Sequence, residues 1–270
     1  MRKTSSAVIG ILLASIIAIP GFSQKKDSKQ TSGKQISQLK TMTWTTKSAE
    51  AKKLASEGAD YFMNIESPQA YEKFKQALAL DPDFTVALVF MANVTEGDVK
   101  KDYVKRALKS SENKTEGEKL FASILKEGAT REANRDVWAK LHEMFPDGGM
   151  IGNFYVVTRA TPEERFTAAQ DYIAKFPKNA CMYNTLAYYY MLDKKDMAKA
   201  KECFDKYIEL YPNGYNPYDS MGEYYITNGD VENAKKYYTM AVEKYPFSNS
   251  SVTALQKINE DAKKQVVNKQ

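Results

Sequence analysis

Proline spacing is the feature of this sequence that most constrains its fold. Five prolines recur at intervals of 31 to 35 residues, apart from one interval of 64: Pro82, Pro146, Pro177, Pro212 and Pro246. A proline cannot continue a helix, and it biases the residue before it away from the helical region. A stop that recurs with this period predicts a stack of repeated units, one of which lacks its closing proline near Asn113.

Two copies of the unit align without a gap, with residues of matching type at six offsets. The first copy has Gly58, Tyr61, Ala70, Phe74, Ala77 and Pro82, and the second has Gly222, Tyr225, Ala234, Tyr238, Ala241 and Pro246. Small residues allow two antiparallel helices to approach closely, and aromatic residues fill the space beside them. The alignment therefore predicts a unit of two helices that pack against each other.

This pattern resembles the tetratricopeptide repeat, a helix–turn–helix unit of about 34 residues. The resemblance covers residues 48–248, and in the copy that ends at Pro212 one residue is inserted before Ala200. It implies an all-α fold, a right-handed α-solenoid of about six helix–turn–helix repeats. Residues 249–270 are expected to form a C-terminal capping helix and tail. The run from Tyr207 to Tyr225 resembles an exported bacterial subgroup of this family, as does the run from Thr45 to Gly58.

Short signals support this register. Three glycines fall where the first helix of a unit should turn into the second: Gly97, Gly128 and Gly229. The pairs Thr115–Glu118 and Thr161–Glu164 have the spacing of capping boxes. Ser67 and Asn216 each precede a proline, and we predict that both are N-caps.

The first 47 residues have a composition unlike that of the repeats. Residues 1–23 combine a basic start, the apolar run Ala7–Ile19 and small residues before Gln24, which predicts a signal peptide. A membrane anchor is the alternative, but the run is shorter than the ~20 residues of a spanning helix. No cysteine lies near the cleavage point, so no lipoprotein is expected. Residues 24–47 read as a flexible basic linker, with Trp44 as a packing anchor at its end.

The net charge of +5 comes from the N-terminal segments. Residues 1–23 carry two basic side chains, and residues 24–47 carry six basic side chains and one acidic one. The repeat region is therefore slightly acidic. Nucleic-acid binding would require basic residues clustered on the folded part of the chain, so nucleic acid is not an expected partner.

No motif for catalysis or metal binding is recognisable. His142 is the single histidine and has no partner at metal-ligand spacing, and neither a phosphate loop nor a nucleophile elbow occurs. The spacing of Cys181 and Cys203 on two antiparallel helices disfavours a disulfide. We therefore predict a protein that is not an enzyme and has no cofactor or metal site.

Tyrosine is the unusual residue of the composition, with 18 copies that include three runs. Consecutive residues of a helix point about 100° apart, so only one ring of each run can face a given interface. Tyr190, Tyr225 and Tyr238 hold the packing positions. The neighbouring rings either anchor a partner or fill the interface between units.

The family resemblance implies that the first helices of successive units line a concave groove. The groove positions select Asn184 and Tyr188 in one unit, and Asp219 and Glu223 in the next. We expect an exported, periplasmic scaffold with no membrane span that binds a protein or peptide at these residues. The alternative function is a structural or assembly factor that bridges components of the cell envelope.

Overall fold

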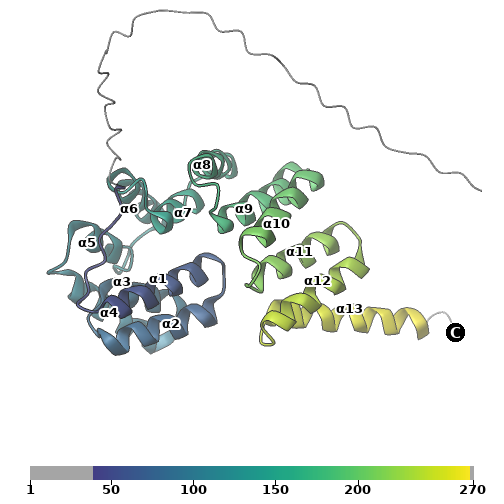
Figure 1. Ribbon diagram of the computed structural model, residues 1–270, viewed down its shortest axis with the longest axis horizontal. Helices are drawn as coiled ribbons and strands as arrows, with labels where there is room; N and C mark the ends of the chain where they lie inside the picture. Colours follow the sequence, from purple (N-terminus) through teal and green to yellow (C-terminus); the bar gives the residue numbers. More distant parts are fainter. Residues whose placement is uncertain (1–38, 268–270) are drawn as a thin grey trace, which may run out of the picture. The chain divides into compact units, whose positions relative to one another are not determined.

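The computed structural model describes residues 39–267, which form thirteen α-helices and one π-helical turn without any strand (Figure 1). The predicted signal peptide and residues 24–38 of the predicted linker lie outside the described residues. The helices are α1 (Ala49–Met63), α2 (Ser67–Leu80), α3 (Thr85–Val94), α4 (Gly97–Ser111), α5 (Glu116–Ser123), α6 (Arg131–Met144), α7 (Gly149–Val157), α8 (Pro162–Lys175), α9 (Ala180–Tyr188), η1 (Tyr189–Lys194), α10 (Met197–Leu210), α11 (Asn216–Thr227), α12 (Val231–Lys244) and α13 (Asn249–Val267).

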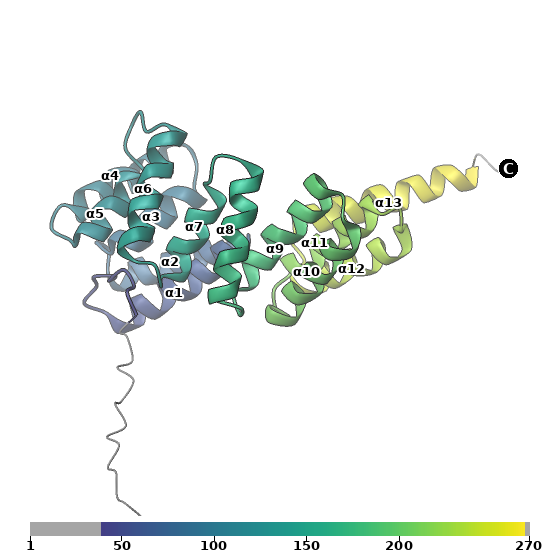
Figure 2. The same ribbon diagram turned by 90° about the horizontal axis from the view of Figure 1, so that it is seen from above.

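The helices pack as six consecutive pairs, from α1 with α2 to α11 with α12, and α13 packs against the last pair (Figure 2). Each pair also contacts the next along the chain. This confirms the predicted all-α solenoid of six helical repeats with an additional C-terminal helix. Within residues 39–267, no helix is both long and apolar enough to cross a membrane.

The aligned glycines lie at the closest approaches within their pairs. A Cβ atom on Gly58 would lie 2.8 Å from the Phe74 ring, and one on Gly222 would lie 2.7 Å from the Tyr238 ring. The aligned alanines are fully buried on the second helices: Ala70, Ala77, Ala234 and Ala241. The repeated sequence pattern therefore encodes one contact, in which an aromatic ring lies directly against a glycine.

Most of the local signals are confirmed. Gly128 and Gly229 turn the chain between paired helices with φ of +75° and +79°, a region that favours glycine. Thr115 and Thr161 both close capping boxes. The predicted N-caps Ser67 and Asn216 are wrong, because each is the first residue of its helix, and neither helix has a capping side chain of its own.

The inserted residue of the fifth unit coincides with the π-helical turn η1, which continues α9. A π turn uses one residue more than an α turn, so it accommodates the insertion within the helix. Tyr189, not the predicted Tyr190, is the more buried ring, and it stacks on Phe166 of the preceding unit with centroids 4.3 Å apart. The tyrosine runs thus contribute to the interface between units.

The first helices of the first four units converge on one aromatic core. Residues 85–92 of α3 are buried on every side. The ring of Phe62 on α1 lies 5.2 Å from that of Phe90 on α3 and 6.1 Å from that of Phe154 on α7. Because α1 contacts α7 directly, side chains fill the space that an open concave groove would occupy in these units.

The turn between α1 and α2 closes the solenoid onto its fifth and sixth units. The Glu66 carboxylate is 1% exposed, and its Oε1 accepts hydrogen bonds from the backbone N–H groups of Tyr215 (2.7 Å) and Asn216 (3.3 Å). Its Oε2 accepts from the Tyr211 hydroxyl at 3.0 Å. Tyr207 donates to the Asn64 carbonyl at 3.5 Å. Glu66 therefore caps α11 from the opposite end of the repeat stack.

Residues 39–47, the described part of the predicted linker, are bonded to the repeats. The buried carboxylate of Glu118 accepts from both the backbone N–H and the hydroxyl of Thr45 at 2.8 Å. Lys40 and Asp147 exchange two hydrogen bonds. The Trp44 ring packs edge-on against Phe84, as expected for a packing anchor. Any flexible part of the linker therefore ends before Leu39.

We predict that Gly222→Ala lowers the free energy of unfolding by about 1–3 kcal/mol, because the added methyl overlaps the Tyr238 ring. Thermal unfolding followed by circular dichroism measures the change. Gly149→Ala is the matched control, since its Cβ would meet only the Tyr172 hydroxyl at 3.7 Å. Equal melting temperatures for the two variants would contradict this packing.

We predict that Glu66→Ala destabilises the protein by about 1–3 kcal/mol, because three buried donors lose their acceptor. Glu66→Gln keeps an acceptor oxygen and should cost less. Burial raises the pKa of Glu66 above its ordinary value of 4.5, against the opposing effect of its hydrogen bonds.

Because the pKa of Glu66 is raised by folding, the folded protein binds a proton at the Glu66 carboxylate more readily than the unfolded chain does. The Glu66 contribution to stability rises as the pH falls towards and through the raised pKa. Denaturant titrations at several pH values measure the free energy of unfolding. The wild type should show the rise in stability at low pH that comes from Glu66, and Glu66→Gln should not. Glu72→Ala, at an exposed position of α2, is the control. A Glu66→Ala protein as stable as this control would contradict the assigned role.

Candidate functional site

A hydrogen bond joins two of the four predicted groove residues, a third is bonded to α13, and the fourth is buried. The Tyr188 hydroxyl lies 2.7 Å from Oε2 of Glu223, and Asp219 Oδ1 accepts from the hydroxyl groups of Ser250 (2.9 Å) and Ser251 on α13. Asn184 is only 5% exposed. Tyr188 and Glu223 are therefore adjacent, Asp219 holds α13, and contact of these residues with a partner stays a prediction.

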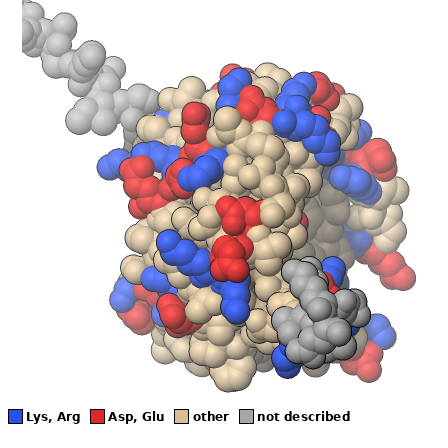
Figure 3. Space-filling model, turned by 90° about the vertical axis from the view of Figure 1, so that its right-hand side faces the viewer, with Lys and Arg blue, Asp and Glu red and all other residues tan. Residues whose placement is uncertain are grey.

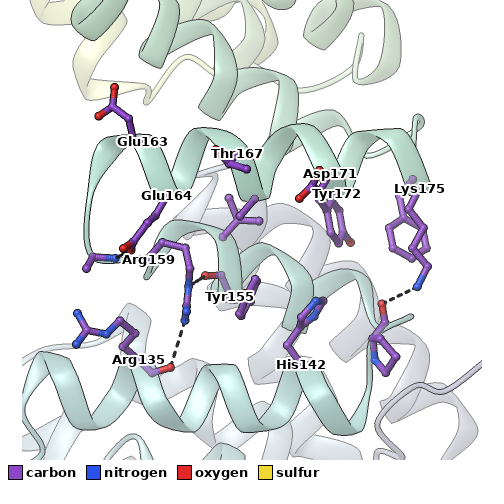
Figure 4. A pocket seen from close by; sticks show the side chains of 15 residues that line it. Arg135, His142, Tyr155, Arg159, Glu163, Glu164, Thr167, Asp171, Tyr172 and Lys175 are labelled. Atoms are coloured by element: carbon purple, nitrogen blue, oxygen red, sulfur yellow. Dashed lines mark hydrogen bonds between the residues drawn. The ribbon is translucent and has the colours of Figure 1, made fainter.

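A separate cleft of about 920 Å³ opens between α6 and α8, with the C-terminal half of α7 between them (Figure 4). It lies between the second helices of the third and fourth units, not along the first helices. Its polar lining residues include Arg135, His142, Tyr155, Arg159, Glu163, Glu164, Thr167, Asp171 and Lys175. This cleft is the candidate site.

Helical periodicity places the lining side chains. Arg135 and His142 are seven residues apart on α6, and Thr167, Asp171 and Lys175 follow at intervals of four on α8. Residues with these spacings share one face of a helix. Thr130 caps the start of α6, and the Thr161–Glu164 box starts α8, so the caps fix the helix starts from which these faces follow.

A stack of three side chains stands in the middle of the cleft. The imidazole of His142 is stacked on the Tyr155 ring with centroids 4.3 Å apart and an angle of 19° between the planes. Cζ of Arg159 lies 4.0 Å from the centroid of the same ring. Figure 4 shows Tyr155 between the two, so one aromatic ring supports a base and a cation from opposite sides. Such cation–π contacts contribute about 0.5–2 kcal/mol.

The Arg159 guanidinium also links α7 to α6 by hydrogen bonds. Its Nε donates to the Tyr155 carbonyl at 3.0 Å, and one Nη donates to the Arg135 carbonyl at 3.4 Å. The Arg165 guanidinium of α8 in turn donates to the Arg159 carbonyl at 3.0 Å. Three helices thus hold the arginines at one end of the cleft.

Most carboxylates around the cleft already have donors. Lys194 and the Tyr189 hydroxyl both bond to Glu163 and lower its pKa. Glu164 accepts from the backbone N–H groups of Ala160 and Thr161. Lys175 lies 2.6 Å from Asp147 and lowers the pKa of that carboxyl. Most of these carboxylates therefore have donors, and Arg135 and Arg159 place two guanidinium groups at one end of the cleft.

The face of the molecule shown in Figure 3 has a different charge pattern. Basic and acidic side chains are interspersed there, and neither sign gathers into one continuous patch. The predicted groove residues Asp219 and Glu223 are carboxylates, but the former is already bonded to serines and the latter to Tyr188. Their capacity to attract a basic partner is correspondingly reduced.

The cleft can bind but shows no arrangement for covalent chemistry. His142 is stacked on an aromatic ring, and burial, with the charges of Lys175 and Arg159 added, lowers its pKa. Among the residues that the structure describes, no group of three or more His, Cys, Asp or Glu side chains is placed to hold a metal ion. The cleft brings together an aromatic ring, hydroxyl groups and fixed guanidinium groups, which are groups that can contact a ligand.

The sequence contains only a weak signal for this site. Tyr155 on α7 and Arg159 just after its end are four residues apart, a spacing that predicts adjacent side chains but not the His142 ring against them. His142 looks like a lone histidine in the sequence, because its partner belongs to the next repeat. Only the packing of α6 against α7 reveals the stack.

Comparisons with known proteins match two of the six repeats to a family. Residues 182–213 and residues 220–248 each match a family model described as the tetratricopeptide repeat. No curated protein is significantly similar to the chain in sequence.

Several solved structures resemble the chain at low sequence identity. The anaphase-promoting complex hetero-tetramer Cut9–Hcn1 shares 14% identity at a TM-score of 0.49, and the match covers 77% of this chain but only 42% of that one. PilW, a type IV pilus biogenesis factor, shares 15% identity at a TM-score of 0.46, and the match covers 77% of this chain and 99% of PilW. PilF of Pseudomonas aeruginosa shares 14% identity at a TM-score of 0.43, and the match covers 78% of this chain and 97% of PilF.

We predict that the single histidine titrates below its ordinary pKa of 6.5. Burial is the largest cause, and the charges of Lys175 and Arg159 add to it. Proton NMR of the His142 ring measures the midpoint without ambiguity, because the chain has one histidine. Lys175→Gln should raise the midpoint, whereas Lys236→Gln on α12 should not. A wild-type midpoint at or above the ordinary value would contradict the geometry of the stack.

Proposed function

We propose that this tetratricopeptide-repeat protein is a non-enzymatic scaffold that binds an extended segment of a protein partner in the cleft between α6 and α8. The observation that carries the proposal is the Tyr155 ring held between His142 and Arg159 inside a cleft of about 920 Å³. Stacked helical repeats present extended surfaces that are used for binding other macromolecules. A rigid aromatic residue in a cleft is a typical anchor for a partner.

The cleft is favoured over the first-helix face for a physical reason. The rings of Phe62, Phe90 and Phe154 fill the space between the first helices of the first four units. Further along, Asn184 is buried and Asp219 is bonded to α13. Tyr188 and Glu223 keep exposed surface, and we retain them as the competing site.

We also propose that the protein acts outside the cytoplasm, as an exported and, in a bacterium with two membranes, periplasmic protein. The support is the sequence of residues 1–23, with its basic start, its apolar run and small residues before Gln24. Intact-mass measurement of the protein from its native cells tests this. A chain that retains residues 1–23 would instead indicate a membrane anchor.

The binding proposal is tested by photo-cross-linking from the exposed position Thr167, in the cleft, in parallel with the exposed position Glu223. A partner captured from Thr167 is identified by mass spectrometry and then titrated by calorimetry. Thr167→Trp should fill the cleft and weaken binding at least about tenfold, which is ~1.4 kcal/mol. Tyr188→Ala and Glu223→Lys should leave the affinity unchanged.

Two results would overturn this assignment. A partner that binds Thr167→Trp as tightly as the wild type does not use the cleft. A partner lost on Tyr188→Ala or Glu223→Lys alone would place the site on the first-helix face. Thermal unfolding of each variant checks that the loss of binding is not a loss of the fold.

A further inference from the structure

The arginines of this protein are concentrated at one place. Five arginines lie within the described residues, and four of them belong to the first half of α6 or to the region where α7 turns into α8: Arg131, Arg135, Arg159 and Arg165. Lysine supplies nearly all other basic side chains of the repeats. Arginine and lysine are not interchangeable, because the planar guanidinium binds a carboxylate through two parallel hydrogen bonds.

Three of these residues form a connected chain, which we call the arginine chain: Arg135, Arg159 and Arg165. Each later member donates to the backbone carbonyl of the earlier one, at 3.0 Å from Arg165 to Arg159 and at 3.4 Å from Arg159 to Arg135. The Tyr155 ring supports Arg159 at 4.0 Å. The positions of the guanidinium groups are thus set before any ligand binds.

No member of the arginine chain forms an ion pair with a carboxylate of residues 39–264. Arg106, the one described arginine outside this group of four, does form an ion pair. One of its Nη atoms lies 3.5 Å from a carboxylate oxygen of Asp102. It also stacks on Tyr103 and donates to the Pro82 carbonyl, so its surroundings otherwise match those of Arg159. The comparison shows that an arginine of this protein can have a carboxylate partner. The lack of such a partner is therefore a feature of the arginine chain.

The hydrogen-bonding capacity of the chain is largely unused. A guanidinium has five N–H donors. Arg159 directs two of them to backbone carbonyls, and no hydrogen bond from the Arg135 side chain is present among the described residues. Glu163 and Glu164 already accept from Lys194, Tyr189 and the backbone N–H groups of Ala160 and Thr161. Glu132 and Asp136, the carboxylates nearest to Arg135 in sequence, form no ion pair with it.

We propose that Arg135 and Arg159 recognise carboxylates, so that the segment bound in the cleft carries two or three adjacent Asp or Glu residues. The inference rests on the proposed function of the cleft and specifies the chemistry of its partner. A local acidic cluster fits better than a polyanion, because Asp171 lines the part of the cleft away from the arginines and repels charge spread along a chain (Figure 4).

The test uses the chain without residues 1–23 and three probes: N-acetyl-tetraglutamate amide, N-acetyl-tetraglutamine amide and inorganic phosphate. Two-dimensional NMR of the arginine Nε–H groups reports binding at each guanidinium. We expect tetraglutamate to shift the Arg135 and Arg159 signals in a saturable manner that weakens as salt is raised. Tetraglutamine should shift neither.

Matched variants separate recognition from folding. Arg135→Gln changes a side chain that makes no hydrogen bond in the described structure, so it should keep the melting temperature and weaken tetraglutamate binding at least tenfold. Arg159→Lys keeps the charge but loses the planar fork, and it should also weaken binding. Arg106→Gln should bind as the wild type does.

The outcomes are decisive for this inference. Tetraglutamate that binds no better than tetraglutamine, or that binds Arg135→Gln as tightly as the wild type, overturns carboxylate recognition. Binding of phosphate without tetraglutamate overturns it in favour of a phosphate site. A protein partner that is lost on Thr167→Trp but retained on Arg135→Gln leaves binding in the cleft intact and overturns only the inference about its charge.

Discussion

The hydrogen bonds of Glu66 connect the two ends of the repeat stack. A buried carboxylate is unfavourable unless donors surround it, and here Tyr211, Tyr215 and Asn216 supply them from the far units. In return Glu66 satisfies backbone N–H groups at the start of α11, a helix without a capping side chain of its own. In a solenoid each unit otherwise contacts only its neighbours. This contact adds a long-range constraint to a fold built from short-range ones.

The inward closure of the early units determines which surfaces remain available for binding. Because α1 packs against α7, the aromatic rings of the first four units face one another and not a ligand. The second helices α6 and α8 stay far enough apart to leave the cleft that contains Tyr155. The hydrogen bonds of Arg159 and Arg165 connect α6, the end of α7 and α8 at one end of this cleft. The packing of the early units therefore fills the concave groove between their first helices and leaves a polar cleft between the second helices α6 and α8.

Contacts between neighbours in the sequence were predictable, and contacts across the stack were not. The glycine-to-aromatic approach at Gly58 and Gly222 follows from offsets within one unit, as does the position of the turn glycines. The N-cap predicted at Asn216 failed because Glu66, 150 positions away, accepts hydrogen bonds from the backbone at the start of α11. The role of His142 was missed for the related reason that its stacking partner lies in the following repeat.

The sequence by itself determined the repeat unit, the number of units and the helix pairs, because these depend on interactions within about 34 residues, where spacing along the chain implies proximity in space. The tertiary structure decided how tightly the units wind. That winding depends on small rotations between successive pairs, which add up along the stack and which no residue spacing records. It closed the face of the first helices in the early units, buried Asn184, brought Glu66 to α11 and placed Arg135 and Arg159 at one end of a cleft.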